Sequence, residues 1–307
     1  MDRIKNSFSI KNLENISGIK AHTIRIWEKR YNLLSPERTN TNIRKYSLDS
    51  LRKLLNITLL YNNGIKISKI AKLSETEIPV LVSDLSLKSK SEQTSINALK
   101  LSMVNFDSLL FDLTFNELIK VKDFEFVYMK IFVPLMTELG ILWQTGAISP
   151  SHEHFITNLI KQKIHVLTDL IQSKIKHPKN EPCFVLFLPE NEIHELSLLF
   201  LNHLILSKGY KTIFLGQSLP TNSLTTLFNF ASKLHFVTFC TVEPGPSKIN
   251  AFLKDFNEQV LISDKYTLSV FGNRIKDVTL NTLPEKIYLL KKLDEFKTEF
   301  LEPSLIV

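Results

Sequence analysis

The C-terminal part of the chain alternates short apolar runs with helix-length segments, and this alternation restricts the fold more than any other feature. The apolar runs are CFVLFLP, YKTIFLG, HFVTFCTV and TLSVFG, and helical patterns lie between them at 195–209, 222–233 and 247–259. Short, continuous apolar runs are typical of parallel strands that are buried on both faces. The sequence therefore predicts a doubly wound, Rossmann-like α/β domain over residues 179–307, with a last helix at 285–300.

Residues 76–178 repeat apolar side chains with helical spacing. The periodic segments are 94–103, 106–118, 124–143 and 150–174, and short polar loops join them. Four helices with short connections favour a four-helix bundle, which would form a cap domain before the α/β domain. A polar, proline-containing linker at 177–182 separates the two.

The positive charge of the chain is concentrated at its N-terminal end. Residues 1–73 hold 15 Lys and Arg against 5 Asp and Glu, whereas the other 234 residues hold 23 against 26. A surface that serves only solubility would spread its charge more evenly. The imbalance indicates a domain over residues 1–75 that binds a polyanion such as nucleic acid, joined to domains with another task.

Within this basic domain the pattern is that of a helix-turn-helix. Ser9 is placed to cap a first helix, Gly18 ends it, and residues 20–31 form a second helix with Ile24 and Trp27 on one face. The second helix of such a pair enters the major groove, and the loop that follows it would form a wing. The predicted DNA contacts are His22, Thr23 and Arg25 for bases, Lys29 and Arg30 for phosphates, and Arg38, Arg44, Lys45 and Tyr46 on the wing.

Two segments of this domain, TIRIWEKRYNLLSPERT and NIRKYS, together resemble the DNA-binding domain of MerR-family transcriptional regulators. That resemblance implies a winged helix-turn-helix and a homodimer on a pseudo-palindromic, double-stranded promoter site. Trp27 and the terminal Arg30-Tyr31 resemble the subgroup that responds to cobalamin. The metal-sensing members use cysteines after the wing domain, where this chain has none, so a metal sensor is not expected.

Two further segments carry chemistry-bearing side chains. In the first, Trp143 precedes Glu153 and His154 at the start of the next predicted helix; this pair also fits an ordinary polar helix start. A zinc site of the form His-x-His is weak there, since residues two apart point to different faces of a helix. In the second, PENEIHELS follows the first predicted strand, at the sheet edge where such folds bind ligands. A lone His194 in this loop is also compatible with an ordinary polar loop residue.

Taken together, a helical cap with these residues and a first loop of the form Glu-x-His-x-x-small resemble the cobalamin-binding module of methionine synthase and of light-sensing MerR-type repressors. The resemblance implies that His194 is the lower axial ligand of cobalt and that Glu192 orients it through the other ring nitrogen. It also implies that Trp143 and Glu153, with His154 beside them, cover the upper face of the corrinoid. The positions implied along the nucleotide tail are Ser197, Cys240, Val242, Gly272 and Asn273.

Several positions depart from the pattern of that family. Ser197 replaces a glycine, Cys240-Thr241-Val242 replaces Ser/Thr-x-Leu, and Asn273 replaces the second glycine of a pair and could crowd the tail. Gln144 stands where some light sensors carry a second histidine. The fold could therefore be retained with corrinoid binding lost or altered.

The function predicted from these features is that of a transcriptional regulator, a repressor rather than an enzyme, whose oligomerisation on DNA is controlled by adenosylcobalamin or methylcobalamin and which could act as a photoreceptor. One alternative is a MerR-type regulator that binds no corrinoid and acts through protein partners. The other is a corrinoid methyltransferase subunit, against which the N-terminal domain argues.

Composition and apolar patterning bear on the compartment. The most apolar stretch, 196–206, is interrupted by Asn202 and His203, so no membrane span is expected. The two cysteines, Cys183 and Cys240, suggest neither a disulfide framework nor a zinc site. These features predict a cytoplasmic protein.

Overall fold

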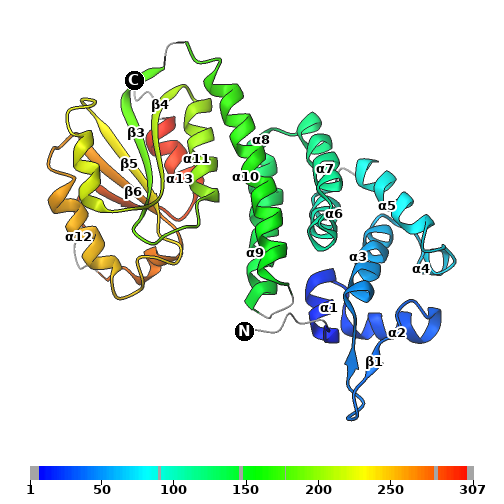
Figure 1. Ribbon diagram of the computed structural model, residues 1–307. Helices are drawn as coiled ribbons and strands as arrows, with labels where there is room; N and C mark the ends of the chain where they lie inside the picture. Colours follow the sequence, from blue (N-terminus) through cyan, green and yellow to red (C-terminus); the bar gives the residue numbers. More distant parts are fainter. Residues whose placement is uncertain (1–6, 89–90, 145–147, 177, 280–282, 303–307) are drawn as a thin grey trace. The chain divides into compact units, whose positions relative to one another are not determined.

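The computed structural model describes residues 7–88, 91–144, 148–176, 178–279 and 283–302 of the 307-residue chain. The chain divides into two compact units, Met1–Ile160 and Lys161–Val307. The boundary falls inside the long helix α10 (Pro150–Gln172), which can be followed in green in Figure 1. The three domains expected at 1–75, 76–178 and 179–307 remain a prediction.

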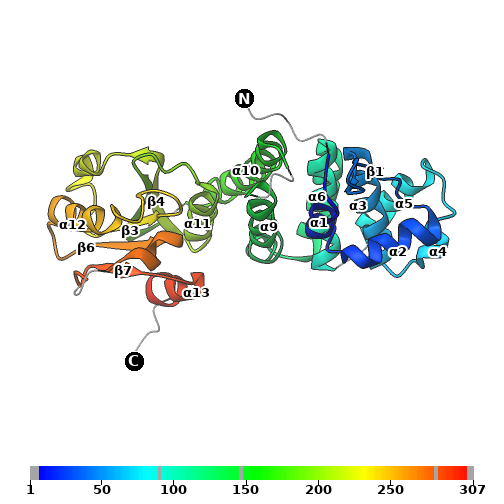
Figure 2. The same cartoon turned by 90° about the horizontal axis from the view of Figure 1, so that it is seen from below.

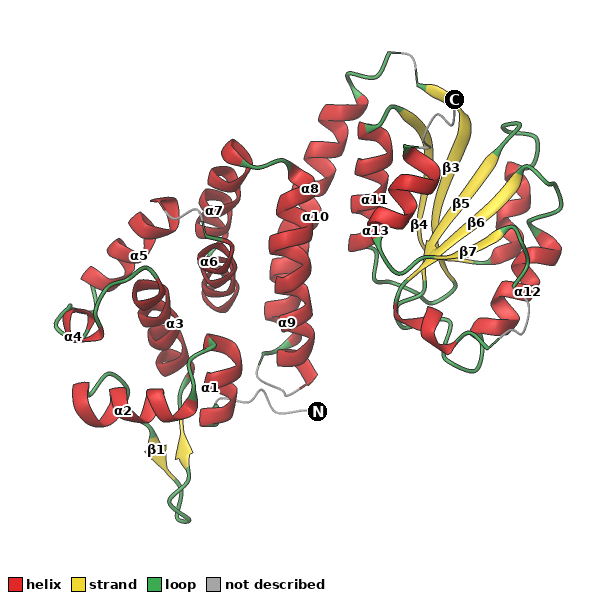
Figure 3. Ribbon diagram, turned by 180° about the vertical axis from the view of Figure 1, so that it is seen from behind, coloured by secondary structure: helices red, strands yellow, loops and turns green. Residues whose placement is uncertain are grey.

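The N-terminal unit begins with the helix-turn-helix. It consists of α1 (Ile10–Ser17), α2 (Ala21–Tyr31), a hairpin of β1 (Glu37–Arg38) and β2 (Arg44–Lys45), α3 (Leu48–Asn62) and α4 (Ile67–Ile70). Ser9 caps α1 in a reciprocal pair of hydrogen bonds with Asn12, and Gly18 ends the helix at a φ of 74°. Figure 3 shows the two-stranded wing projecting from the helices of this unit.

The helical part that follows contains α5 (Glu77–Lys88), α6 (Glu92–Asn105), α7 (Ser108–Val121), α8 (Phe124–Val127), a π-helical turn (Tyr128–Phe132), α9 (Val133–Gln144) and α10. Apart from α5, these elements occupy the four segments with helical periodicity. Their core is aromatic, and the rings of Phe115 and Phe132 stack with centroids 6.0 Å apart. None of the helices in the described ranges is long and apolar enough to cross a bilayer.

A buried lysine joins the helix-turn-helix to the helices behind it. Lys100 of α6 is 3% exposed. Its Nζ donates to the carbonyl of Ile16 at the end of α1, at 3.3 Å, and forms an ion pair with Glu138 of α9. An ammonium group removed from water needs such partners. The end of α1 in the helix-turn-helix is thereby held to α6 and α9 within one unit.

The second unit is built on a parallel sheet of five strands in the order β4-β3-β5-β6-β7. The strands are β3 (Lys179–Pro189), β4 (Tyr210–Leu219), β5 (Leu234–Phe239), β6 (Tyr266–Phe271) and β7 (Ile287–Leu289). Helices α11 (Leu196–Ser207) and α13 (Leu293–Phe296) pack on one face, and α12 (Ile249–Gln259) packs on the other. In Figure 2 the sheet lies between α12 and α11. The predicted mixture of an all-α region and a doubly wound parallel sheet is confirmed.

Two predicted helices of this unit are wrong. Residues 222–233 form only a 3-10 turn, Thr221–Leu227. There the hydroxyls of Thr225 and Thr226 bond backbone carbonyls three residues back, at 2.7 and 2.9 Å, which competes with regular helix formation.

The second wrong prediction is the single helix at 285–300. Its start is the edge strand β7, where Ile287 pairs with Leu268, and α13 follows with a π-helical turn, Lys297–Leu301. A short apolar run cannot be assigned to helix or strand by periodicity alone.

Candidate functional sites

The recognition helix α2 divides its side chains between core and solvent as the sequence predicts. Ile24 and Trp27 are buried, and the Trp27 ring meets Tyr61 edge-on with centroids 5.1 Å apart. The opposite face is exposed. It carries His22, Arg25, Lys29 and Arg30, with Thr23 half-buried beside them. A basic face of this kind matches what the major groove and its phosphates require.

The wing is tied to α2 by a carboxylate that the sequence analysis did not single out. Glu28 lies on the flank of α2, and its side chain is 9% exposed. Its Oε2 accepts a hydrogen bond from Arg44 Nε at 3.0 Å, and its Oε1 accepts a hydrogen bond from the hydroxyl of Tyr46. Burial, and then the Glu28 carboxylate, raise the pKa of Tyr46 above its usual range.

This arrangement changes the role expected of two wing residues. Tyr46 is fully buried, and its backbone pairs with Phe8 in both directions at 2.8 and 2.9 Å, so its predicted contact with DNA does not fit the structure. Arg44 is half-buried against Glu28. Arg38 and Lys45 are exposed on the hairpin, and Arg38 donates to Asn42 at 2.5 Å.

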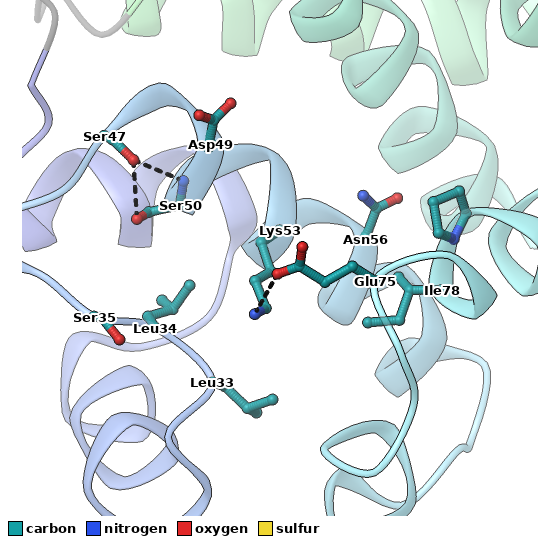
Figure 4. A pocket seen from close by; sticks show the side chains of 11 residues that line it. Leu33, Leu34, Ser35, Ser47, Asp49, Ser50, Lys53, Asn56, Glu75 and Ile78 are labelled. Carbon is teal, nitrogen blue, oxygen red and sulfur yellow. Dashed lines mark hydrogen bonds and ion pairs between the residues drawn. The ribbon is translucent and has the colours of Figure 1, made fainter.

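A cavity of about 430 Å³ opens in the N-terminal unit, and Figure 4 shows side chains that line it. It lies between Leu33 and Leu34 after α2, Ser50 of α3, and Glu75, and Lys53 Nζ lies 3.5 Å from Glu75 Oε1 beside it. No residue predicted for DNA or for a cofactor lines it.

In the second unit, the carboxyl edge of the sheet is organised around Glu192. The chain leaves β3 and β5, which are neighbours in the sheet, in opposite directions, so their carboxyl ends form the topological switch point at which such folds bind ligands. Glu192 follows β3 and is fully buried. Its Oε2 accepts from the backbone N–H groups of Thr241, Val242 and Glu243, after β5, at 3.1, 2.7 and 2.9 Å.

The other oxygen of the same carboxylate holds His194. Oε1 accepts from the backbone N–H groups of Ile193 and His194 at 2.9 and 3.0 Å, and it lies 2.5 Å from His194 Nδ1. The imidazole is 52% exposed, whereas the carboxylate is buried. Burial alone would raise the pKa of Glu192, but hydrogen bonds from His194 and from the backbone lower it to about 2. Glu192 is therefore an anion that fixes a half-exposed imidazole at the sheet edge.

Other positions predicted for the cofactor surround this loop. Val242 is 45% exposed, Ser197 is half-buried at the start of α11, and Asn273 is exposed. Gly272 has a φ of 103°, and a Cβ there would come within 2.4 Å of the Cys240 carbonyl oxygen. The close approach of two backbones therefore accounts for this glycine.

Cys240 and Thr238 are both buried at the carboxyl end of β5 but differ in polarity. Cys240 is a buried member of the hydrophobic core, and burial, then the charge of Glu192, raise the pKa of its thiol well above the usual range. Cys240 is thus a buried residue of the core, and its place along a nucleotide tail remains a prediction. Thr238 lies two residues earlier on β5, on the same face by strand alternation. It is fully buried, and its Oγ1 has no hydrogen-bond partner among the described residues.

The residues expected to cover a corrinoid belong to the N-terminal unit. Trp143 lies in α9, and its side chain is outside the described part of the chain. Glu153 lies in the first turn of α10, where its Oε1 accepts from Thr157 Oγ1 at 2.7 Å, and His154 follows it with a side chain that is 73% exposed. Their grouping with the sheet edge remains a prediction.

Two known protein families match separate parts of the chain. Residues 8–77 match the model of the MerR HTH family regulatory protein, and residues 95–168, which span α6 to most of α10, match that of the B12 binding domain. The chain therefore carries a MerR-type DNA-binding domain and a B12-binding-type domain. The second match covers helices rather than the sheet.

Similar whole proteins agree with this combination. The chain is 22% identical to the HTH-type transcriptional repressor CarH of Myxococcus xanthus over 72% of this chain and 74% of that protein. It is 24% identical to the repressor CarA of the same organism, over 70% of each. A solved corrinoid protein for monomethylamine from Methanosarcina barkeri has a TM-score of 0.52 at 15% identity, covering 65% of this chain and 93% of that chain, which shows a shared fold. The MerR-type chain is thus a distant homologue of CarH and CarA.

Proposed function

We propose that this protein is a transcriptional repressor whose assembly on its operator is controlled by a cobalamin. The MerR-type domain supports DNA binding, and the distant similarity to CarH and CarA supports repression. An enzyme such as a corrinoid methyltransferase subunit is not favoured, because the curated relatives named above are repressors. Double-stranded promoter DNA and a second copy of the chain are the partners, since one winged helix-turn-helix reads only a half-site.

In this proposal Arg25 reads a base edge and the exposed Lys29 and Arg30 contact phosphates. Arg25 lies on the exposed face of α2, where its guanidinium can form two hydrogen bonds with a guanine. Replacing Arg25 by Ala should lower the discrimination between operator and random DNA by about 1–3 kcal/mol. The measurement is a gel-shift titration with both duplexes. Equal affinities of wild type and variant for the operator would remove Arg25 from base reading.

The observation that best supports cobalamin binding is the contact between Glu192 and His194. The residues at the switch point fit a cobalamin, because a half-exposed imidazole is oriented through Nδ1 by a buried anion, as metal-binding histidines commonly are. The unpaired hydroxyl of Thr238 offers a hydrogen bond to a ligand group that enters along the sheet.

Each residue then has a defined task. His194 would hold the cobalt and Glu192 would keep its imidazole in one orientation, and the resemblance implies that Trp143 and Glu153 would contact the corrinoid as well. Adenosylcobalamin, when bound, supplies absorption of visible light and a cobalt–carbon bond that light breaks. A change of assembly on DNA in response to light follows from this proposal.

The experiment is a binding test with the full chain. Protein is incubated in the dark with adenosylcobalamin, then with methylcobalamin in a separate sample, desalted, and its visible spectrum is recorded. Wild type should stay red, and His194→Ala should bind more weakly with a shifted spectrum. The matched control is Glu190→Gln, an exposed carboxylate of the same loop, which should behave as wild type.

Colourless wild-type protein that still binds operator DNA would favour the alternative of a MerR-type regulator that acts through protein partners. In that event Asn273→Gly tests whether the exposed Asn273 side chain crowds the tail. A red Asn273→Gly variant would show a pocket closed by that residue, and a colourless one would end the cobalamin proposal.

A further inference from the structure

The exposed face of the recognition helix contains one apolar side chain among its basic ones. Ile26 is 52% exposed, whereas Ile24 and Trp27 on the same helix are buried. Successive residues turn by about 100° around a helix, so Ile26 lies on one stripe with His22 and Arg30, four residues before and after it. An isoleucine in this position contributes nothing to the core of the unit.

The groups that surround Ile26 restrict what can cover it. His22 and Arg30 are exposed on its own stripe, and Arg25 and Lys29 are exposed on the same face. A second copy of the chain that docked on Ile26 would bring two such basic faces together, which like charges oppose. A polyanion is attracted to the same face.

DNA offers one partner for an apolar side chain at this place. Phosphates and most base edges present only polar groups, and the C5-methyl group of thymine is the apolar feature of the major groove. A β-branched side chain at the centre of a basic stripe has the shape and polarity to contact that methyl group. It gains nothing from a phosphate.

We propose that Ile26 contacts the C5-methyl group of a thymine in the major groove and thereby specifies a T·A pair in each half-site. The inference rests on the proposed DNA-binding function and adds a specificity-determining residue to it. Arg25 reads polar base edges, and Ile26 reads the apolar one.

The test removes the methyl group and nothing else. A duplex is selected from a random library with the full-length protein, and each thymine is then replaced singly by deoxyuridine. Wild type should lose about fourfold in affinity at one thymine of each half-site, the effect of one buried methyl-sized group. Ile26→Ala should bind the thymine and deoxyuridine duplexes equally at that position.

Ile43 provides a matched control. It is 60% exposed on the wing hairpin, between β1 and β2, and not on the recognition helix. Ile43→Ala should keep the full thymine-to-deoxyuridine difference, whatever its affinity. Because Ile26 is exposed, its replacement leaves the core intact, and an unchanged fluorescence of buried Trp27 verifies the fold.

Two results would overturn the inference while leaving the proposed function intact. One is a wild type that is indifferent to deoxyuridine at every position of its selected duplex, and the other is an Ile26→Ala variant that retains the difference. A chain that selects no sequence at all would overturn the proposed function together with this inference.

Discussion

Two buried carboxylates, one in each unit, fasten segments that are far apart in the sequence. Glu28 of α2 holds Arg44 and Tyr46, at the end of the wing. Glu192 of the loop after β3 holds His194 and the turn that follows β5. Glu28 thus fixes the end of the wing against α2, and Glu192 stands directly behind His194, the residue predicted to hold the cofactor.

The partners of the two carboxylates differ in kind. Glu28 is held by two side chains, a guanidinium and a phenol, and remains 9% exposed. Glu192 is fully buried and accepts from five backbone N–H groups as well as lying against one imidazole. Side chains can change rotamer one at a time, but a backbone cage has no such freedom. Glu192 therefore holds the carboxyl edge of the sheet through backbone groups, whereas Glu28 holds the end of the wing through side chains.

The largest effect is expected from Glu192→Gln. The amide keeps the volume but replaces one acceptor oxygen by a donor, which leaves buried backbone N–H groups facing an N–H group. We expect a loss of about 2–4 kcal/mol in the free energy of local opening. Hydrogen exchange of peptides from β3 and from the turn at 241–243 measures it.

Glu190→Gln, on the exposed side of the same loop, serves as the control and should leave exchange unchanged. Glu192→Gln should also weaken cobalamin binding while leaving affinity for DNA without cobalamin as in wild type. Equal protection in the two variants would show that the backbone cage does not organise the edge.

A smaller and more local effect is expected from Glu28→Gln. The variant loses the ion pair with Arg44 and the charge that accepts the Tyr46 hydroxyl proton, for a cost of about 1–3 kcal/mol. Both tryptophans of the chain, Trp27 and Trp143, lie in the N-terminal unit, so their fluorescence during urea unfolding follows this unit alone. Glu37→Gln, an exposed carboxylate of β1, is the control. DNA affinity should fall in Glu28→Gln and not in the control.

The second unit should lose stability in acid, whereas the wing should lose stability in alkali. His235 in the core of the second unit has Nδ1 2.7 Å from Thr267 Oγ1 and Nε2 2.9 Å from Ser269 Oγ, and burial lowers its pKa to about 3. An unfolded histidine titrates near about 6.5. Folding therefore favours the neutral imidazole, and the stability that this contributes is present above the unfolded pKa of about 6.5. The free energy of unfolding should fall by about 1 kcal/mol as the pH is lowered from about 7 to 5.5.

The wing behaves in the reverse way. The pKa of Tyr46 is raised in the folded state, so the stability it contributes is present below about pH 10, where unfolded tyrosine ionises, and is lost above it. Protection factors, which are corrected for the intrinsic pH dependence of exchange, should fall first at β5 in acid and first at the wing in alkali. The same order at both ends of the pH range would contradict the contrast.

The sheet could be predicted from the sequence, but the contacts of Glu28 with the wing and of Glu192 with the turn at 241–243 could not. Buried parallel strands leave continuous apolar runs such as CFVLFLP, whereas β7, Ile287–Leu289, is too short to show a period. The resemblance to the cobalamin-binding family paired Glu192 with His194 in one loop, and the structure shows that contact. The contact of Glu192 with the turn at 241–243 lies about fifty residues away in the chain and depends on which strands become neighbours.

Glu28 was missed for the same reason. In TIRIWEKRY it reads as one charge among others on a helix, and only the return of the wing shows that it faces Tyr46. Ile26 could have been found, because a helical wheel places it opposite the core. Thr238 could not, since an unpaired hydroxyl is a property of its surroundings and not of its sequence.

The smallest effect is expected from the two wing cations, Arg44 and Lys45. Comparing their variants tests whether the ion pair with Glu28 keeps Arg44 from contacting a DNA phosphate. Arg44 is half-buried in its ion pair, whereas Lys45 beside it is exposed. Each cation that neutralises a phosphate contributes about one unit to the slope of log affinity against log salt. Lys45→Ala should therefore lower this slope by about one unit without changing stability. Arg44→Ala should cost up to about 1 kcal/mol in unfolding free energy, as partly exposed pairs do, and should change the slope less.

Gel-shift titrations at several salt concentrations give both slopes. A larger change in the Arg44 variant would mean that Arg44 reaches a phosphate in the complex and that the Glu28 tie opens on DNA.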